Sequence, residues 1–403
     1  MLLINTQSLD LEEFIGNAIP RYAILSHTWG TEEVSFQEWC DKDLAAGKAG
    51  YKKIFSACQQ ARADGLQYLW VDTNCIDKKS SAELSEAINS MFAFYGNSDR
   101  CYVYLADFHN PNTSCYTETV KPSQSGEPAE PRELHGCRWF TRGWTLQELL
   151  APNSVIFFDS KWQKVGEKQN ALFCDQLSRI TGIDTRHLES RRSIFTASVS
   201  ERMSWVARRQ TTREEDIAYC MLGIFGINMP LLYGEGSRAF LRLQEEIIRV
   251  SNDQTIFCWN YPNPAQYSNI WDSVLAPHPY VFADSRKYIP TPSDDTYYSL
   301  TNNGISIKLR GVVIDRAHTL ALLAAAAVDD KHYQLALILQ KQGSQHCRNP
   351  HERLRRIPWQ IAKEVRCKSF VLVLSLWTTR DKAQRREYLL IIPKRHSPLY
   401  HFD

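Results

Sequence analysis

This sequence has no hydrophobic run that is long enough to cross a membrane. The most apolar stretch, residues 217–233, is interrupted by Asn228 and Pro230 and falls short of the roughly 20 apolar residues that a spanning helix needs. Residues 1–7 lack the basic segment and the long apolar core of a secretory signal. These absences predict a soluble, cytoplasmic protein with no membrane span.

The sequence also lacks a strong excess of charge of either sign. Its 47 Lys and Arg residues nearly balance 45 Asp and Glu residues, which leaves a net charge of +2. Domains that bind nucleic acid usually carry a clear basic excess, so the composition predicts no nucleic-acid partner. With 403 residues, 43% of them hydrophobic, the chain is long enough for two or three globular domains.

Several signatures of metal binding and catalysis are missing. None of the 11 cysteines forms a C-x-x-C pair and no Cys/His cluster has zinc spacing, which predicts free thiols in a reducing compartment and no metal site. There is no phosphate-binding loop, no G-x-S-x-G elbow, no H-E-x-x-H motif and no internal repeat. We therefore expect no required cofactor.

The first half of the chain alternates between short apolar runs and helical periodicity. Ser80 and Glu83 form a capping-box pattern ahead of one helix, and four apolar runs indicate strands at residues 22–25, 68–71, 101–105 and 155–158. The alternation predicts an α/β fold with a mainly parallel, flavodoxin-like sheet flanked by helices, with the first run at its centre. We expect this core to span residues 1–185, with a mobile, proline-rich insertion at 109–134.

The second half has a different pattern. Helical spacing predicts a helical extension at residues 186–253, and a β-rich accessory domain is expected at 254–403. The predicted strands of that domain are residues 255–259, 304–314, 333–339, 370–376 and 388–392. A basic run at 348–356 is interpreted as a solvated loop, with a docking patch as the alternative. We expect the β-rich part to pack on the core, because the helices leave little linker.

Polar residues follow the first two apolar runs, at the points where strands of a parallel sheet would end. Ligands bind outside the carboxyl ends of the strands in such sheets. The residues are Ser26, His27 and Trp29 after the first run, and Asp72 and Asp77 after the second. A hydroxyl, an imidazole and an indole are suited to contact a ribose and a flat ring. The alternative interpretation is a helix N-cap beside a packed tryptophan.

A second candidate is the helix that ends before Pro152, since proline disfavours helix at the residue before it. Three leucines form one stripe of this helix, and the opposite face carries Thr141, Trp144 and Glu148. A carboxylate that packs against an indole has a raised pKa and can act as an acid or a base. The alternative is an ordinary exposed or N–H-bonded helix glutamate.

Three segments carry a family resemblance, and they are residues 22–30 (YAILSHTWG), 68–77 (YLWVDTNCID) and 143–149 (GWTLQEL). In this order and spacing they resemble the motifs of fungal heterokaryon-incompatibility (HET) domains, and the resemblance covers roughly residues 1–260. It departs at Asn74, where the family often has a cysteine, and at Thr141, where serine is common.

The HET core is also remotely similar to Toll/interleukin-receptor (TIR) domains. Their motif places a glutamate and then a leucine four residues after a tryptophan, and Trp144, Glu148 and Leu149 fit it. In TIR enzymes this glutamate supports cleavage of the glycosidic bond of NAD. The serine and cysteine that flank the tryptophan in TIR domains are replaced here by Arg142 and Thr145.

These resemblances imply an effector of vegetative incompatibility that triggers programmed cell death in non-self recognition, with NAD as its substrate. The implied site has Glu148 as catalytic group, Ser26, His27 and Trp29 around the ribose and the rings, and Asp72, Asp77 and Trp144 as walls. One alternative is a non-enzymatic signalling module, in which the same residues serve self-association or bind an incompatibility partner; another is an unrelated carboxylate hydrolase. An open Glu148 near Ser26 and Asp72 favours an enzyme, and a sealed or ion-paired one favours the module.

Overall fold

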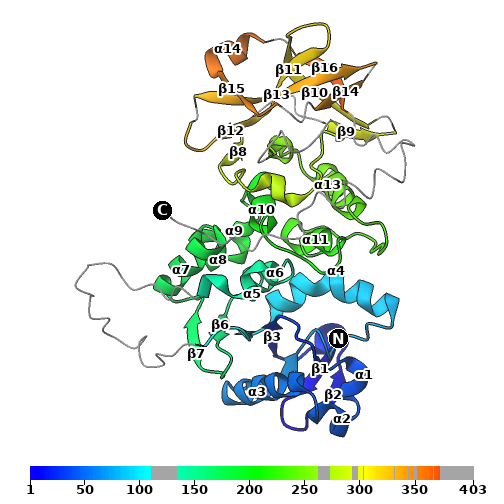
Figure 1. The fold of residues 1–403 in the computed structure, drawn as a ribbon, viewed down its shortest axis with the longest axis vertical. Coiled ribbons are helices and arrows are strands. Elements are labelled where there is room, and N and C mark those ends of the chain that lie inside the picture. Colours follow the sequence, from blue (N-terminus) through cyan, green and yellow to red (C-terminus); the bar gives the residue numbers. More distant parts are fainter. Residues whose placement is uncertain are drawn as a thin grey trace, which may run out of the picture.

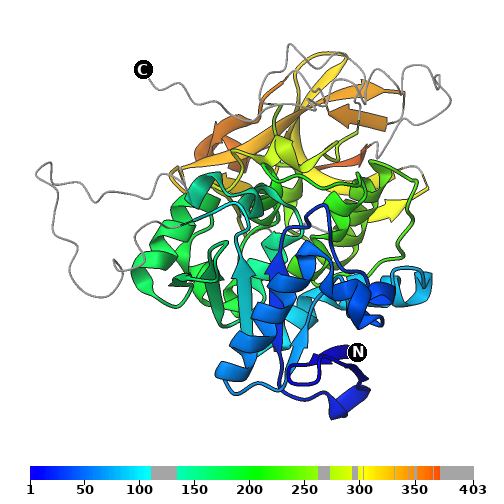
Figure 2. The same ribbon diagram turned by 60° about the horizontal axis from the view of Figure 1, so that its bottom comes forward.

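The computed structural model describes residues 1–109, 134–261, 273–292, 298–302, 304–330, 332–343, 345–348, 352–365 and 367–372. The α/β part and the β-rich part lie at opposite ends of the molecule, with a group of helices between them (Figures 1 and 2). The predicted insertion at 109–134, apart from its two end residues, lies outside the described residues. So does the predicted strand at 388–392.

A seven-stranded sheet forms the centre of the α/β part. Its four middle strands are parallel and correspond to the four predicted runs: β3 (Ala23–His27), β4 (Tyr68–Trp70), β5 (Arg100–Tyr104) and β6 (Val155–Phe158). Three outer strands pair antiparallel: β1 (Leu2–Asn5), β2 (Leu11–Glu13) and β7 (Lys164–Glu167). The order β2-β1-β4-β3-β5-β6-β7 confirms the central place of the first run. The predicted mainly parallel sheet is corrected to a mixed one.

The order of the parallel strands changes direction between β3 and β5. The chain passes from β3 to β4 on one side and then to β5 and β6 on the other. Every residue of β3 and of β6 is buried, which explains why both read as continuous apolar runs. The carboxyl ends of β3 and β5 therefore flank a topological switch point, the place where open α/β sheets bind ligands.

Helices of very different length flank the sheet: α1 (Phe36–Trp39), α2 (Lys42–Ala46), α3 (Ala49–Ala63), α4 (Ser81–Asn97), α5 (Arg138–Thr141), α6 (Thr145–Leu150), α7 (Ala171–Thr181), α8 (Thr185–Glu189) and α9 (Arg191–Ile194). Helix α4 begins as predicted, because the Ser80 side chain accepts the backbone N–H of Glu83. Across the described ranges, no helix combines the length and the apolar character that crossing a membrane requires.

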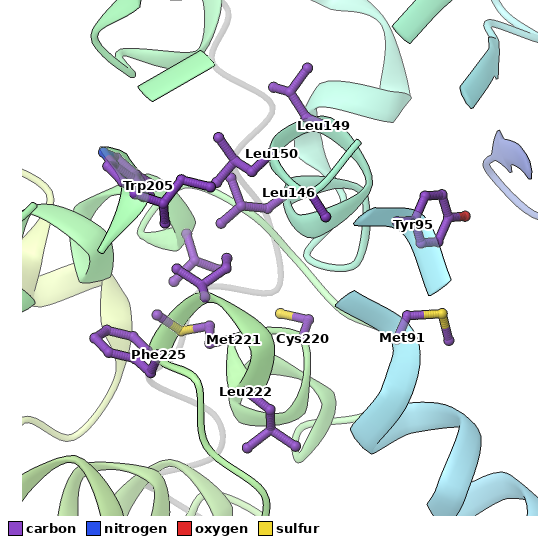
Figure 3. Close-up of a cluster of buried hydrophobic side chains, with 14 of the residues drawn as sticks. Met91, Tyr95, Leu146, Leu149, Leu150, Trp205, Cys220, Met221, Leu222 and Phe225 are labelled. Atoms are coloured by element: carbon purple, nitrogen blue, oxygen red, sulfur yellow. The ribbon is translucent and has the colours of Figure 1, made fainter. Parts of the chain in front are cut away.

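Four further helices follow: α10 (Val199–Val206), α11 (Asp216–Tyr219), α12 (Leu222–Phe225) and α13 (Arg238–Val250). Helix α12 packs against α4, and α11 packs against α13. In Figure 3, Met91 and Tyr95 of α4 and Leu146 of α6 share one buried cluster with Cys220 and Met221. The helices predicted in this region are therefore present, and they cover α6.

The β-rich part consists of β8 (Tyr288–Pro290), β9 (Tyr298–Thr301), β10 (Gly304–Val313), β11 (His318–Leu322), β12 (Ala325–Ala327), β13 (Tyr333–Gln342), β14 (Gln345–Arg348), β15 (Arg355–Pro358) and β16 (Cys367–Leu372), with helix α14 (Trp359–Glu364). Strands β10, β11, β13, β14 and β16 pair in a closed ring, to which β9 and β15 add at the outside. The predicted strands at 304–314 and 333–339 are confirmed. The one at 255–259 is wrong, since Gln254–Phe257 forms a 3-10 helix.

The predicted packing of the β-rich part on the α/β core is corrected: it packs on the helical segment that lies between the two parts (Figure 1). The Tyr298 hydroxyl donates to the carbonyl of Ser251 at 2.5 Å, and Arg348 donates to the carbonyl of Phe257 at 2.9 Å. Arg348 is only 2% exposed and stacks on Trp259. The interpretation of the basic run as a solvated loop is therefore wrong at Arg348, because carbonyl groups at this junction require a donor.

Candidate functional site

A tight turn leads into α6, where the sequence pattern predicted an unbroken helix. Arg142 is extended, with φ −86° and ψ 141°, and bridges to Gln210. The Gly143 N–H donates to the Gln210 carbonyl at 2.9 Å, and a Cβ at Gly143 would lie 2.6 Å from a side-chain carbon of the opposing segment. Glycine is required at this close approach. The predicted shared face of Thr141 and Glu148 is wrong, because the helix is interrupted between them.

Glu148 lies in the interior of the molecule, beneath the carboxyl end of β3. The Ser26 hydroxyl donates to Glu148 Oε2 at 2.5 Å, and Trp139 Nε1 donates to Ser26 Oγ at 2.8 Å. The Tyr95 hydroxyl of α4 donates to the Leu25 carbonyl at 3.2 Å and lies close enough to the Glu148 carboxyl group to lower its pKa. Glu148 is 8% exposed and Ser26 is fully buried. Arg209 attracts the carboxylate, but the two form no ion pair within the described ranges.

This environment favours the neutral carboxylic acid. Burial is the largest influence and raises the pKa of Glu148 to about 8, and repulsion by Asp72 acts in the same direction. The hydrogen bond from Ser26, the nearby Tyr95 hydroxyl and the charge of Arg209 lower the pKa in part. Glu148 is therefore mostly protonated at neutral pH, and a cation that approached it would draw the proton off.

Two buried cations hold α6 in place at its two ends. Arg209 donates to the Arg142 carbonyl at 2.9 Å and to Thr145 Oγ1 at 3.0 Å, where the helix begins. Lys168 donates to the Leu149 carbonyl at 3.0 Å, near the end of the helix. Burial lowers the pKa of Lys168 to about 8 and that of Arg209 to about 10. These contacts fix the position from which Glu148 reaches Ser26.

His27 is a buried imidazole with two carboxylates on one side. Its Nε2 lies 3.6 Å from Glu33 Oε2 and 3.9 Å from Asp72 Oδ1. Its side chain is 1% exposed, and neither ring nitrogen has a hydrogen-bond partner in the described part of the chain. Lys53 pairs with Glu33. Burial opposes ionisation of Glu33, yet attraction to His27 and the ion pair with Lys53 hold the pKa of Glu33 well below its usual range.

Trp29 and Asp72 form the outer part of this group. Trp29 Nε1 donates to Asp72 Oδ2 at 2.8 Å, and the indole is 53% exposed. The Lys78 ammonium lies 3.7 Å above the centre of the indole ring and 3.8 Å from Asp72 Oδ2. The structure thus brings Ser26, His27, Trp29, Asp72 and Glu148 into one continuous cluster, from the interior to the surface.

Two predicted site residues have other contacts. The Asp77 carboxylate accepts from Gln37 Nε2 at 2.6 Å and from the backbone N–H of Lys79 at 3.0 Å, which orders the loop before α4. The Trp144 side chain forms a hydrogen bond with Asp216 of α11. Neither contact joins these residues to the Ser26–Glu148 pair.

Sequence reasoning missed several members of the cluster, namely Glu33, Lys53, Tyr95, Trp139 and Arg209. Tyr95 reads as part of the apolar face of α4, and only its hydroxyl could have indicated a polar contact. A buried arginine such as Arg209 has no sequence signal, because arginine is usually exposed. The described residues contain no group of three or more His, Cys, Asp or Glu side chains that could hold a metal ion.

Comparison with known proteins identifies two regions. Residues 22–148, which include every predicted site residue, match the family model described as heterokaryon incompatibility protein (HET), and residues 238–359 match a domain of unknown function (DUF8212). Over 232 residues the chain is 47% identical to the vegetative incompatibility protein HET-E-1 of Podospora anserina. That stretch is 57% of this chain and 16% of the relative, so the chain spans less than a fifth of that relative's length. No solved structure matches.

These matches support the HET resemblance drawn from the three motifs, and the region that matches the HET family model is residues 22–148. The likeness to TIR domains remains a prediction.

Proposed function

We propose that this chain is an effector of vegetative incompatibility, which triggers cell death in non-self recognition by cleaving NAD at the Glu148 site. The match of residues 22–148 to the HET family and the identity to an incompatibility protein support the biological role. The four parallel strands lie in the order β4-β3-β5-β6. The chain thus adds β4 on one side of β3 and then β5 and β6 on the other, and this order supports a flavodoxin- or TIR-like core.

One observation carries the chemical part of the proposal. Glu148 is a buried carboxyl group without an ion-pair partner in the described ranges, bonded to Ser26 at 2.5 Å beside the switch point of the sheet. A structural glutamate at such depth is normally paired with a cation, because an unpaired buried charge is costly. Groups with strongly shifted pKa values concentrate at functional sites.

The reaction requires a negative charge where a positive one develops. The bond between C1′ of the ribose and the nicotinamide nitrogen breaks, and its electron pair leaves with nicotinamide. Water then adds to C1′ and releases a proton, which gives ADP-ribose. The cationic nicotinamide ring favours loss of the Glu148 proton, and the resulting carboxylate stabilises the oxocarbenium-like centre. Ser26 orients that carboxylate, and His27 and Trp29 lie on the side from which a ligand would approach.

The direct test is incubation of the purified protein with NAD, followed by measurement of released nicotinamide. Glu148→Gln keeps the shape of the side chain and removes the charge, so it should lower the rate by about 10²–10³-fold. Glu13→Gln is a matched control, since it makes the same change at an exposed position of the edge strand β2. Equal nicotinamide release by wild type and Glu148→Gln would contradict the catalytic assignment.

A second function is favoured by a separate observation. Glu148 and Ser26 are closed off from solvent, and Trp144 is bonded to Asp216 of the covering helices. This arrangement also suits a signalling module that acts through self-association or an incompatibility partner, without catalysis. Expression of Glu148→Gln in fungal cells separates the two functions. Killing that persists with a soluble, folded variant would support the module.

A further inference from the structure

Arg138 presents a positioned but only partly used guanidinium group at the surface of the site. Both hydrogen bonds of this group come from Nη2, which donates to Thr28 Oγ1 at 3.0 Å and to the Trp29 carbonyl at 2.8 Å. Within the described ranges, Nε and Nη1 have no partner. The two bonds hold the plane of the guanidinium in place, while the remaining N–H donors can bind a further acceptor.

The charge of Arg138 is not balanced by the acids around it. Glu33 is paired with Lys53, and Asp72 lies 3.8 Å from the Lys78 ammonium. The Asp107 carboxylate accepts the backbone N–H of Arg138 at 2.7 Å and forms no ion pair with its guanidinium in the described part of the molecule. A cation that is fixed in direction and left without a counter-charge is suited to bind an anion.

The position of Arg138 relates it to Glu148. The next residue, Trp139, holds Ser26 from the inside, while Arg138 holds Thr28 and Trp29 from the outside. Thr28 is two residues beyond Ser26, or about 7 Å along an extended chain. The anion would therefore lie further out along the same chain segment than the Ser26–Glu148 pair.

We propose that Arg138 anchors the diphosphate group of the ligand. This inference rests on the proposed NAD cleavage and extends it to recognition of the substrate. In NAD the diphosphate is attached to C5′ of the ribose whose C1′ carries nicotinamide, so this substrate needs an anion site on the outer side of the group that acts at C1′, which is where Arg138 lies relative to the Ser26–Glu148 pair. The planar guanidinium fork binds phosphate oxygens in pairs, which a lysine cannot reproduce.

The test uses inorganic pyrophosphate as the probe, so that binding is measured without catalysis. Calorimetric titration of the full chain should detect binding that weakens as salt rises. Arg138→Gln should weaken pyrophosphate binding by about 10–100-fold. Arg138→Lys keeps the charge but loses the planar guanidinium fork, so its affinity should lie between those of wild type and Arg138→Gln. Arg21→Gln is the matched control. Arg21 lies before the amino end of β3, away from the carboxyl end that Arg138 contacts, and its side chain is 81% exposed. This substitution should leave binding unchanged.

Kinetics give a second readout. For NAD, Arg138→Gln should raise KM about tenfold or more and leave kcat unchanged, whereas cleavage of nicotinamide riboside, which has no diphosphate, should not change. Equal losses with both substrates would indicate that Arg138 only braces residues 28–29, and would overturn the proposal.

The two proposals can fail separately. Pyrophosphate binding that is lost in Arg138→Gln and kept in Arg21→Gln supports the anion site, even if the protein does not cleave NAD. Absence of pyrophosphate binding by the wild type, or equal binding by Arg138→Gln and wild type at the same melting temperature, overturns the anion site even if NAD is cleaved. If Arg138→Gln does not fold, Arg138→Lys decides: affinity equal to wild type contradicts a role for the fork, and a clear loss supports it.

Discussion

Replacement of Glu148 by glutamine is expected to stabilise the protein, and to do so increasingly as the pH rises. Glu148 is buried and its pKa is raised to about 8, so the folded state retains a proton that the unfolded chain releases near the ordinary value of 4.5. Between these two values the folded state binds more protons than the unfolded state, and stability contributed by this group falls as pH increases. Glutamine is neutral at every pH and does not carry this penalty.

The size of the effect follows from the two pKa values. A difference of about 3.5 pKa units corresponds to about 5 kcal/mol when Glu148 is ionised in both states, above roughly pH 9. At pH 7 the same shift gives about 3 kcal/mol, and below pH 4.5 the difference vanishes because the carboxyl group is protonated in both states. For a chain of 403 residues that unfolds cooperatively, about 3 kcal/mol raises Tm by roughly 3–4 °C.

Thermal melts of wild type and Glu148→Gln at pH 4.5, 7 and 8.5 measure this difference directly, since other titrating groups affect both proteins alike. Leu149→Ala is the internal control, because it should destabilise by about 2–5 kcal/mol through a cavity at every pH. Two results would refute the reasoning. One is a Tm of Glu148→Gln below that of wild type at pH 7, and the other is a difference in Tm between the two proteins that does not change with pH. Such a result would mean that a cation compensates the Glu148 charge.

Two other substitutions test the contacts around the site and the junction of the two parts. Ser26→Ala should lower the free energy of unfolding by about 1–3 kcal/mol, because Trp139 and Glu148 each lose a buried partner. It should also raise the pKa of Glu148 further, and an NMR titration that shows a lower pKa would contradict this. Arg348→Met should leave the Phe257 carbonyl without its donor and loosen the β-rich part, so limited proteolysis should release a fragment that begins near residue 260 sooner than from wild type. Equal release from both proteins would count against this role of Arg348.

The sequence predicted the centre of the sheet because parallel strands that are buried on both faces read as continuous apolar runs. The cluster of Ser26, His27 and Asp72 could be predicted for the same reason, since the carboxyl ends of neighbouring parallel strands meet at one edge. The short antiparallel strands β1, β2 and β7 were missed, because three or four residues are too few to show a period of two.

The remaining differences depend on contacts between distant segments. The helix break at Gly143 depends on the hydrogen bond to Gln210. The environment of Glu148 depends on Tyr95 and Arg209. A local sequence pattern reveals neither set of contacts. The burial of Arg348 has the same origin, since its acceptors lie about 90 residues earlier in the chain. A helical wheel placed Glu148 correctly opposite the leucine stripe, but it could not show that this face is covered as well.

The outer strands of the two seven-stranded sheets limit how copies of this chain can associate through the backbones of those sheets. Within the described ranges these strands are β2 and β7 in the first sheet and β9 and β15 in the second, and each has only three or four residues. Charged side chains occupy three of them: Glu12 and Glu13, Lys164 and Glu167, and Arg355 and Arg356. Short, charged edges resist addition of a foreign strand. Fibre growth by addition of strands to these edges is therefore disfavoured, and association through the same faces of the described residues would depend on side chains.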